Sequence, residues 1–272
     1  MLKMDPHLFP TSFLILVFMI FILIHAPRSV YADDERFTTC RDQLVQCGNL
    51  PNMRYPFWGG NRPEYCGHPG FNLSCQENVP RLTIRSRTYR VLDIDNTTQT
   101  LTVALDDFWN NICPKYLYNA TLDSNLFSYT SNTVNFTLYY GCPLIPGQAL
   151  LPSQFSCSPN GTATSSYYAP YLGTITIEGS STSTCSDILI VHVFQTAAVA
   201  LTTTVPSIMI GAALDQGFEL RWQANDTICS ECVGSGGRCG YDLDSNLFTC
   251  YCADQPYTLV CNGTQSGTGM CP

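Results

Sequence analysis

The chain has 272 residues, of which 13 are Lys or Arg and 21 are Asp or Glu, and its charged fraction is 12%. That fraction is about half of the ~25% usual in soluble domains. Because the balance is acidic and no block of basic residues occurs, the composition excludes nucleic-acid binding as the function.

The first 32 residues have the pattern of a secretory signal peptide. Lys3 and His7 precede an apolar run from Phe13 to Ile24, and the small residue Ala32 stands at the expected cleavage site. An apolar helix of that length spans roughly 18 Å, well short of the ~30 Å hydrocarbon core of a membrane. We therefore expect residues 1–32 to be removed and the mature chain to be secreted.

All fifteen cysteines follow this segment, and the first of them is Cys40. In a secreted chain they should form up to seven disulfides and leave one cysteine over, with a connectivity that spacing alone does not give. Cys261 and Cys271, in the polar tail, are the expected places for the unpaired cysteine. The candidates for disulfides are Cys40, Cys47, Cys66, Cys75, Cys113, Cys142, Cys157, Cys185, Cys229, Cys232, Cys239, Cys250 and Cys252.

Glycosylation sequons are spread along the whole mature chain. They predict a glycosylated surface, on which glycans supply the hydration that the few ionic side chains do not. The predicted glycosylation sites are Asn72, Asn96, Asn119, Asn135, Asn160, Asn225 and Asn262.

Short β-branched or alternating stretches separated by turn-rich loops predict a mainly β, disulfide-rich, glycosylated fold with short strands and long loops. Expected strands are Arg81–Asp95, Thr100–Leu105, Val134–Tyr140, Thr174–Glu178 and Asp187–Phe194, with a helical turn or two within Ala197–Leu214. In residues 81–89, alternation places Arg81, Arg85 and Arg87 on one face with Thr83 and Tyr89, and Leu82 and Ile84 on the other.

Residues 188–214 carry no charged side chain and raise the question of a membrane span. His192, Gln195 and Pro206 make the stretch too polar for a good span. The run Ile188–Phe194 is better explained as a buried strand. We therefore predict no membrane span in the mature chain.

The loop at residues 55–71 reads YPFWGGNRPEYCGHPGF, and it is too rich in proline and glycine for a helix or a regular strand. Its aromatics either fill a small core or form a surface for a ligand. Eight of the eleven cations that follow residue 32 lie in residues 33–112, so this part of the chain is also the less acidic one.

Two blocks of motifs resemble the extracellular region of plant wall-associated receptor kinases, and more closely that of leaf-rust-resistance-locus-like receptor kinases. The first contains Cys47-Gly48-Asn49, Tyr55-Pro56-Phe57-Trp58-Gly59, Arg62 to Phe71 and Leu73-Ser74-Cys75, and resembles the galacturonan-binding module. The second contains Gly217 to Trp222, Cys229-Ser230-Glu231-Cys232, Ser235 to Gly240 and Phe248 to Cys252, and resembles the C-terminal module.

The resemblance implies two cysteine-rich modules, at residues 33–145 and 146–254, followed by a tail at 255–272. The sequence has no His-Arg-Asp catalytic loop and no Asp-Phe-Gly motif, so kinase activity is not expected of it. We expect a secreted protein of the apoplast or, alternatively, the ectodomain of a truncated single-pass receptor.

Other chemistries are less well supported by the residues, and we predict no enzyme, no metal and no cofactor. The spacing of Cys229 and Cys232 would suit zinc in a cytosolic protein, but secretion favours disulfides. The only histidines after residue 32, His68 and His192, are expected to be structural. Asp106 and Asp107 could be offered as a glycosidase pair, but in a strand they would point to opposite faces, and in a solvated turn they need no function.

Binding of an acidic polysaccharide requires aromatic faces for sugar C–H groups and guanidinium groups for carboxylates. The resemblance implies pectin, as homogalacturonan, as the ligand, bound chiefly by residues 33–112. The alternative is a protein-interaction module, a decoy or co-receptor that engages receptor ectodomains or peptides. The predicted ligand-binding residues are Arg54, Tyr55, Phe57, Trp58, Arg62, Arg81, Arg85 and Arg87.

Overall fold

The structure of the chain is a computed structural model, and it describes residues 33–50, 53–119, 121–143, 153–157, 164–170, 185–203 and 208–262. The predicted signal peptide, the predicted strand Thr174–Glu178, the sequon at Asn160 and Cys271 lie outside the described residues. The described part is mainly β, as the sequence predicts.

The elements are as follows in chain order. The helices are α2 (Glu35–Asp42), α3 (Gln195–Thr203), α4 (Ile208–Gln216) and α5 (Asp226–Gly234), and the 3-10 turns are η1 (Glu64–Cys66), η2 (Pro69–Phe71) and η3 (Asp106–Phe108). The strands are β1 (Leu73–Gln76), β2 (Val79–Ile84), β3 (Arg87–Asp95), β4 (Thr100–Leu105), β5 (Phe127–Tyr129), β6 (Thr133–Cys142), β7 (Gln154–Ser156), β8 (Ser165–Pro170), β9 (Asp187–Phe194), β10 (Phe218–Trp222), β11 (Arg238–Asp242), β12 (Leu247–Tyr251) and β13 (Pro256–Tyr257).

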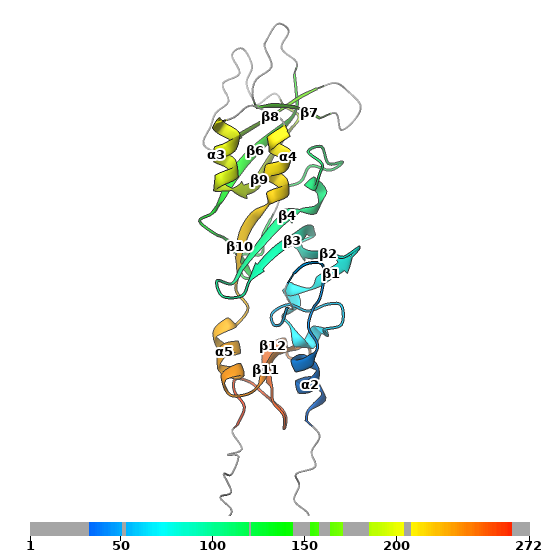
Figure 1. The fold of residues 1–272 in the computed structure, drawn as a ribbon, viewed down its shortest axis with the longest axis vertical. Coiled ribbons are helices and arrows are strands. Elements are labelled where there is room, and N and C mark those ends of the chain that lie inside the picture. Colours follow the sequence, from blue (N-terminus) through cyan, green and yellow to red (C-terminus); the bar gives the residue numbers. More distant parts are fainter. Residues whose placement is uncertain are drawn as a thin grey trace, which may run out of the picture.

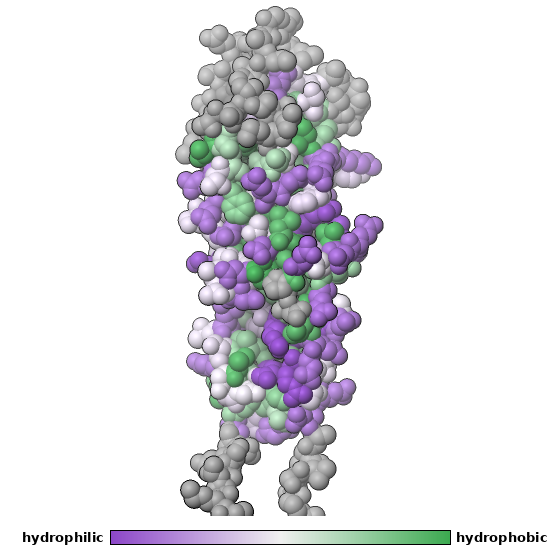
Figure 2. Space-filling model, in the orientation of Figure 1, coloured by the Kyte–Doolittle hydropathy of each residue, from purple (hydrophilic) through white to green (hydrophobic). Residues whose placement is uncertain are grey.

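Three antiparallel sheets follow one another along an elongated molecule (Figure 1). The sheet in the middle has the strand order β1-β2-β3-β4-β10-β5. The sheet at one end has the order β7-β8-β6-β9 and carries α3 and α4 beside it, and the small sheet β11-β12-β13 lies at the opposite end with α2 and α5. Hydrophobic and hydrophilic residues are interspersed over the described surface in the view of Figure 2.

The middle sheet joins segments that are far apart in the sequence. Strand β10 lies between β4 and β5, with Leu220 opposite Leu101 on one side and opposite Tyr129 on the other. The sheet therefore combines strands from both sides of the predicted module boundary at residue 145. That boundary stays a prediction about the sequence modules, and the two segments share one hydrophobic core.

The two ends of the described chain meet in the small sheet region. The backbone N–H of Asp34 donates to the carbonyl of Ala253 at 2.9 Å. Helix α2 begins there because the side chain of Asp34 accepts hydrogen bonds from the N–H groups of Arg36 and Phe37, which satisfies two free donors of the first turn. The buried residues Phe37 and Cys40 then anchor α2 against the rest of the molecule.

The predicted single strand over Arg81–Asp95 is wrong, because the chain reverses direction within it. Arg85 and Ser86 have φ angles of 44° and 69° and form the turn of a hairpin between β2 and β3. Positive φ at both central residues matches the type of two-residue turn that antiparallel strands favour. Leu82 and Ile84 do face the core, as alternation predicts, but Tyr89 is fully buried with them.

The expectations for the later strands hold more closely. Strands β4 and β9 have the predicted bounds, Thr100–Leu105 and Asp187–Phe194, and β6 contains the predicted stretch Val134–Tyr140. Helical structure in residues 195–216 exceeds the predicted turn or two, because α3 and α4 each have nine residues. No helix in the described part of the chain combines the length and the apolar character that a bilayer crossing requires.

Seven disulfides link the described residues. They are Cys40–Cys66, Cys47–Cys75, Cys113–Cys157, Cys142–Cys185, Cys229–Cys239, Cys232–Cys250 and Cys252–Cys261. The thirteen cysteines predicted to form disulfides are all among them. Of the two places expected for the unpaired cysteine, Cys261 is bonded to Cys252, and Cys271 lies outside the described residues.

Candidate functional site

The aromatic loop at residues 55–71 mainly builds the core. Phe57 is fully buried and packs edge-on against Phe71 and Trp222, with ring centroids 5.6 and 5.2 Å away. Trp58 is half-buried, and its indole N–H donates to the carbonyl of His68 at 2.8 Å. Phe57 therefore has no exposed surface for a ligand, and its predicted place in the binding set is corrected to the core.

Arg62 is also a structural residue, although it was predicted to bind the ligand. Only 2% of its surface is exposed, and its guanidinium group donates to the carbonyls of Cys40, Gln43, Phe57 and Cys66 at 2.7–3.1 Å. Burial, with a smaller contribution from the charge of Arg54, lowers the pKa of Arg62 to about 10. The side chain is therefore still cationic near neutral pH, and its charge is held by carbonyl dipoles.

The hairpin arginines do not share one free face. Arg81 and Arg90 lie opposite each other on β2 and β3, and both bond to the carboxylate of Asp106. Arg87 is paired with Asp107 at 3.1 Å, with 12% of its side chain exposed. The carboxylates of Asp106 and Asp107, which the sequence analysis sets aside as a glycosidase pair, are therefore engaged in ion pairs, because η3 presents both to the hairpin.

Arg85 differs from its neighbours because it lies in the turn. Its side chain is 55% exposed and lies 4.0 Å from Asp123, an ion pair that solvent screens. Arg87 and Asn96 are nine positions apart along the extended chain of β3, a distance of roughly 30 Å. Because Asn96 and Gln99 lie beside Arg54 and Tyr55, the structure divides the predicted arginines between two distant places.

Arg54 and Tyr55 line a groove of about 440 Å³ between the aromatic loop and the C-terminal cysteine-rich region. We call this groove, with Arg54, Tyr55, Arg62, Gln99 and Arg238 among its lining residues, the arginine groove. Arg238 belongs to β11 and is absent from the predicted ligand-binding residues, because that prediction considered cations in residues 33–112 alone. Arg238 is one of only three cations after residue 112. A cation in so acidic a part of the chain was the sequence feature that could have identified it as a candidate site residue.

The three arginines of the groove have no carboxylate partner among the described residues. Arg54 is exposed and donates to the carbonyl of Arg41 at 2.9 Å. Arg238 is half-buried over the ring of Phe37, donates to the carbonyl of Gly237, and has a buried Nε–H with no hydrogen-bond partner in the described structure. Arg54 is exposed and therefore has guanidinium donors available to an anion, and Arg238 adds positive charge to the same groove.

Two acidic residues lie close to the arginine groove, and both are engaged. Asp226 lines the groove, and its carboxylate accepts the backbone N–H of Ala224 at 2.9 Å. Asp42 forms two hydrogen bonds with Arg41, at 2.7 and 3.0 Å, which lower its pKa, and Arg238 and Arg54 lower it to a smaller extent. The groove therefore carries more positive than negative charge, in a chain that is acidic as a whole.

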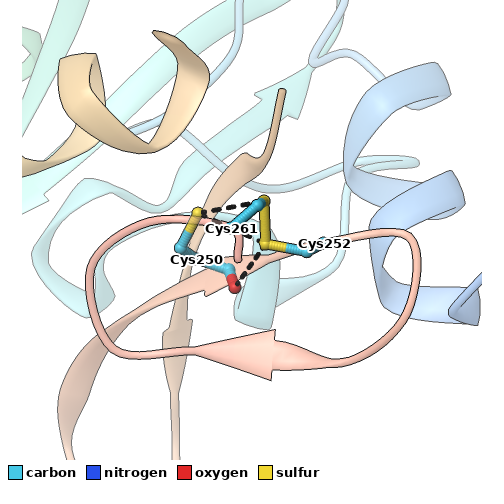
Figure 3. A group of neighbouring side chains, drawn as sticks. All are labelled: Cys250, Cys252 and Cys261. Atoms are coloured by element: carbon cyan, nitrogen blue, oxygen red, sulfur yellow. Dashed lines mark hydrogen bonds between the residues drawn. A yellow bond between two sulfur atoms is a disulfide. The ribbon is translucent and has the colours of Figure 1, made fainter. Parts of the chain in front are cut away.

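The cysteine cluster that could suggest a metal is a pair of adjacent disulfides. The sulfur of Cys250 lies 3.8 Å from that of Cys252 and 3.9 Å from that of Cys261 (Figure 3). Cys252 and Cys261 are bonded to each other, and Cys250 is bonded to Cys232. Zinc requires thiolates as ligands, which disulfide sulfurs do not supply.

The sequons lie at the surface where the structure describes them. Asn72, Asn96, Asn119, Asn225 and Asn262 are exposed, and Asn135 is partly exposed on β6. Asn96 also lines the arginine groove. A glycan attached to Asn96 would stand at the rim of the groove. Glycosylation of these asparagines stays a prediction.

Comparison with protein families gives two matches. Residues 40–105 match the wall-associated receptor kinase galacturonan-binding family, and residues 156–255 match the wall-associated receptor kinase C-terminal family. No solved structure gives a significant match. Because Arg54 lies in the first match and Arg238 in the second, the arginine groove is formed by both.

Similar proteins cover nearly the whole chain. Leaf rust 10 disease-resistance locus receptor-like protein kinase-like 2.1 of Arabidopsis thaliana is 28% identical over 94% of this chain, which corresponds to 40% of that protein. Kinase-like 2.4 and kinase-like 1.3 of the same organism are 31% and 32% identical over 85% and 86% of the chain, and 35% and 32% of their own lengths.

These matches define the class as the extracellular region of a wall-associated-type plant receptor kinase, with a galacturonan-binding module and a C-terminal module. Within that class the chain belongs with the leaf rust 10 receptor-like kinases, of which it spans less than half. Both modules are of a non-catalytic type, and such modules are extracellular.

Proposed function

We propose that the chain binds an acidic pectic polysaccharide without catalysis, and that galacturonate carboxylates bind in the arginine groove. The observation that supports this most directly is that Arg54 and Arg238 have no carboxylate partner in the described structure, while Arg81, Arg85 and Arg87 each have one. A guanidinium group binds a carboxylate with two parallel hydrogen bonds, so the groove is chemically complementary to a uronate.

The position of the groove adds to this argument. Its two walls come from the two matched modules, so a ligand in the groove would contact both of them. The charge of buried Arg62 behind the wall is not neutralised by an acid of the described structure, and it favours an anion.

The test measures binding of an oligogalacturonide of defined length to the full secreted, oxidised chain. We expect Arg54→Gln and Arg238→Gln each to weaken binding by about ten-fold, since a charge-assisted hydrogen bond contributes about 1.5–3 kcal/mol when well formed and about 1.4 kcal/mol corresponds to ten-fold. Arg85→Gln is the matched control, because it removes an exposed arginine of the same module outside the groove. It should change the affinity less than about two-fold.

Two further controls distinguish charge-dependent binding from nonspecific binding. Methyl-esterified oligomers should bind weakly, and raising the ionic strength from about 0.05 to about 0.5 M should weaken binding of the acid form. Unchanged affinity of the Arg54→Gln, Arg238→Gln double variant, with an unaltered unfolding midpoint, would exclude the arginine groove as the site. Loss of binding in Arg85→Gln instead would assign it to the hairpin.

A further inference from the structure

We propose that the outer face of the middle sheet is a second binding site, which takes a neutral oligosaccharide. A trough of about 580 Å³ crosses β3, β4 and β10 and extends to residues 128–132, at β5 and the turn that follows it. We call it the sheet trough. None of the residues that line the arginine groove, and none of the predicted ligand-binding residues, lines the sheet trough.

The strand register arranges the floor of the sheet trough in two rows. In the first row Asp93 lies opposite Thr102, which lies opposite Glu219. In the second row Asp95, Thr100, Arg221 and Ser128 lie opposite one another in that order. Paired residues of neighbouring strands point to the same face about 5 Å apart. The floor is therefore a fixed grid of hydrogen-bond acceptors and donors on regular strands.

The charged members of this grid have no ion-pair partner among the described residues. Asp93, Glu219 and Arg221 form no salt bridge within the described ranges, although all three line one trough. One oxygen of Glu219 accepts a hydrogen bond from the amide of Asn132 at 3.3 Å, which orients the carboxylate. Sugar hydroxyls both donate and accept, so they match a grid that offers carboxylates, hydroxyls and a guanidinium group together.

Charge and polarity decide the class of ligand. Three carboxylates against one guanidinium group in the lining oppose a polyuronate, so the sheet trough and the arginine groove select different ligands. A peptide partner would need an apolar or aromatic anchor in a desolvated pocket. The aromatic residue in the lining is Tyr129, but its strand position is opposite buried Leu220, and its 38% exposed ring stacks on His192 with ring centroids 4.0 Å apart. A polyhydroxylated neutral ligand fits this surface better than either.

Two sources of such a ligand are available, namely a free wall oligosaccharide and the glycan of the chain itself. The turn between β3 and β4 separates the two sites, since Asn96 and Gln99 line the arginine groove while Asp95 and Thr98 line the sheet trough. A glycan on Asn96 would therefore start within reach of the trough. The test distinguishes the two sources by removing this sequon.

The probes are labelled cello-, xylo- and manno-oligosaccharides, and binding is measured on the full oxidised chain with and without Asn96→Gln. We expect at least one probe to bind and Asp93→Asn with Glu219→Gln to weaken it at least ten-fold. Arg54→Gln with Arg238→Gln should leave it unchanged. Binding that appears only with Asn96→Gln identifies the glycan of the chain as the natural occupant.

The outcomes for this site are independent of those for the arginine groove. The proposal would be overturned if no neutral probe bound to the chain either with or without Asn96→Gln. It would also be overturned if the Asp93→Asn, Glu219→Gln variant bound the probe as tightly as the wild type. If no sugar binds, but a lysine-rich peptide binds to the wild type and not to the Asp93→Asn, Glu219→Gln variant, the sheet trough is a protein-binding site and the proposal is wrong. Galacturonide binding should persist in the Asp93→Asn, Glu219→Gln variant, because neither residue lines the arginine groove.

Discussion

Phe57 and Trp222 meet edge-on in the core, with ring centroids 5.2 Å apart and an interplanar angle of 79°. Phe57 comes from the loop of the galacturonan-binding module, and Trp222 ends β10, which lies between β4 and β5. The first module therefore depends on a strand that follows it by more than one hundred residues in the sequence. A fragment of residues 33–112 would expose the edge of β4, so it is unsuitable for testing binding.

Truncating this contact should destabilise the whole described fold. We expect Trp222→Ala and Phe57→Ala each to lower the free energy of unfolding by about 3–5 kcal/mol, because both rings are buried and a cavity would remain. Trp58→Phe is the control, since it removes one hydrogen bond of a half-buried ring and should cost about 1 kcal/mol. Denaturant unfolding under oxidising conditions measures the difference. Equal midpoints for Trp222→Ala and the wild type would contradict the shared core.

Arg62 should be replaceable by lysine only at a large cost in stability. The guanidinium group binds four carbonyls at once, including those of Cys40 and Cys66, which form one disulfide. A lysine ammonium has three donors and no planar fork, so at least one buried carbonyl would lose its partner. We expect Arg62→Lys to lower the free energy of unfolding by about 2–4 kcal/mol. Arg54→Lys, at an exposed side chain, should change it by less than about 0.5 kcal/mol.

The local pattern of the sequence predicts some strands well. Thr100–Leu105 and Asp187–Phe194 are β-rich runs with clear turn signals on either side, and β4 and β9 have those bounds. The hairpin at Arg85 and Ser86 was missed because positive φ there is carried by residues other than the usual glycine or asparagine. Helix α2 was missed although Asp34 is a good N-cap residue, because its hydrophobic face is short.

Long-range pairing could not be read from local pattern. Nothing within Phe218–Trp222 indicates that β10 lies between β4 and β5, and this placement is what brings the second module to Tyr55. The arginine groove shows the same limit, since the charge count pointed to residues 33–112 and gave Arg54 but not Arg238. The disulfide partners were likewise open, because the number of pairings is too large for spacing to decide.

Gly237 should tolerate no side chain, because it packs directly on the two adjacent disulfides. A Cβ atom there would collide with the sulfur of Cys250 and lie 2.8 Å from the sulfurs of Cys232 and Cys261. We expect Gly237→Ala to lower the secreted yield and to give mispaired cysteines in peptide mapping. The neighbouring variant Gly234→Ala is the matched control, since no atom lies within 4 Å of its added Cβ. Native pairing at normal yield in Gly237→Ala would contradict this packing.

His192 should make the stability of the fold depend on pH. It is 8% exposed, stacks on Tyr129, and its Nδ1 has no hydrogen-bond partner in the described structure. Burial lowers the pKa of His192 to about 4, from 6.5 in an exposed histidine. Below about pH 6.5 the unfolded state therefore binds a proton that the folded state does not, so stability falls as the pH falls toward 4.

The size of the effect follows from the pKa difference. At about 1.4 kcal/mol per unit, His192 should contribute a loss of roughly 3 kcal/mol between about pH 7 and pH 4. His192→Phe keeps a ring on Tyr129 and removes the titrating group, so urea unfolding at about pH 7 and about pH 4.5 should give a smaller difference for this variant than for the wild type. His68, whose pKa is also lowered by burial, titrates in both proteins and leaves a common residual slope. An identical pH dependence in the two proteins would mean that His192 is protonated without opening the core.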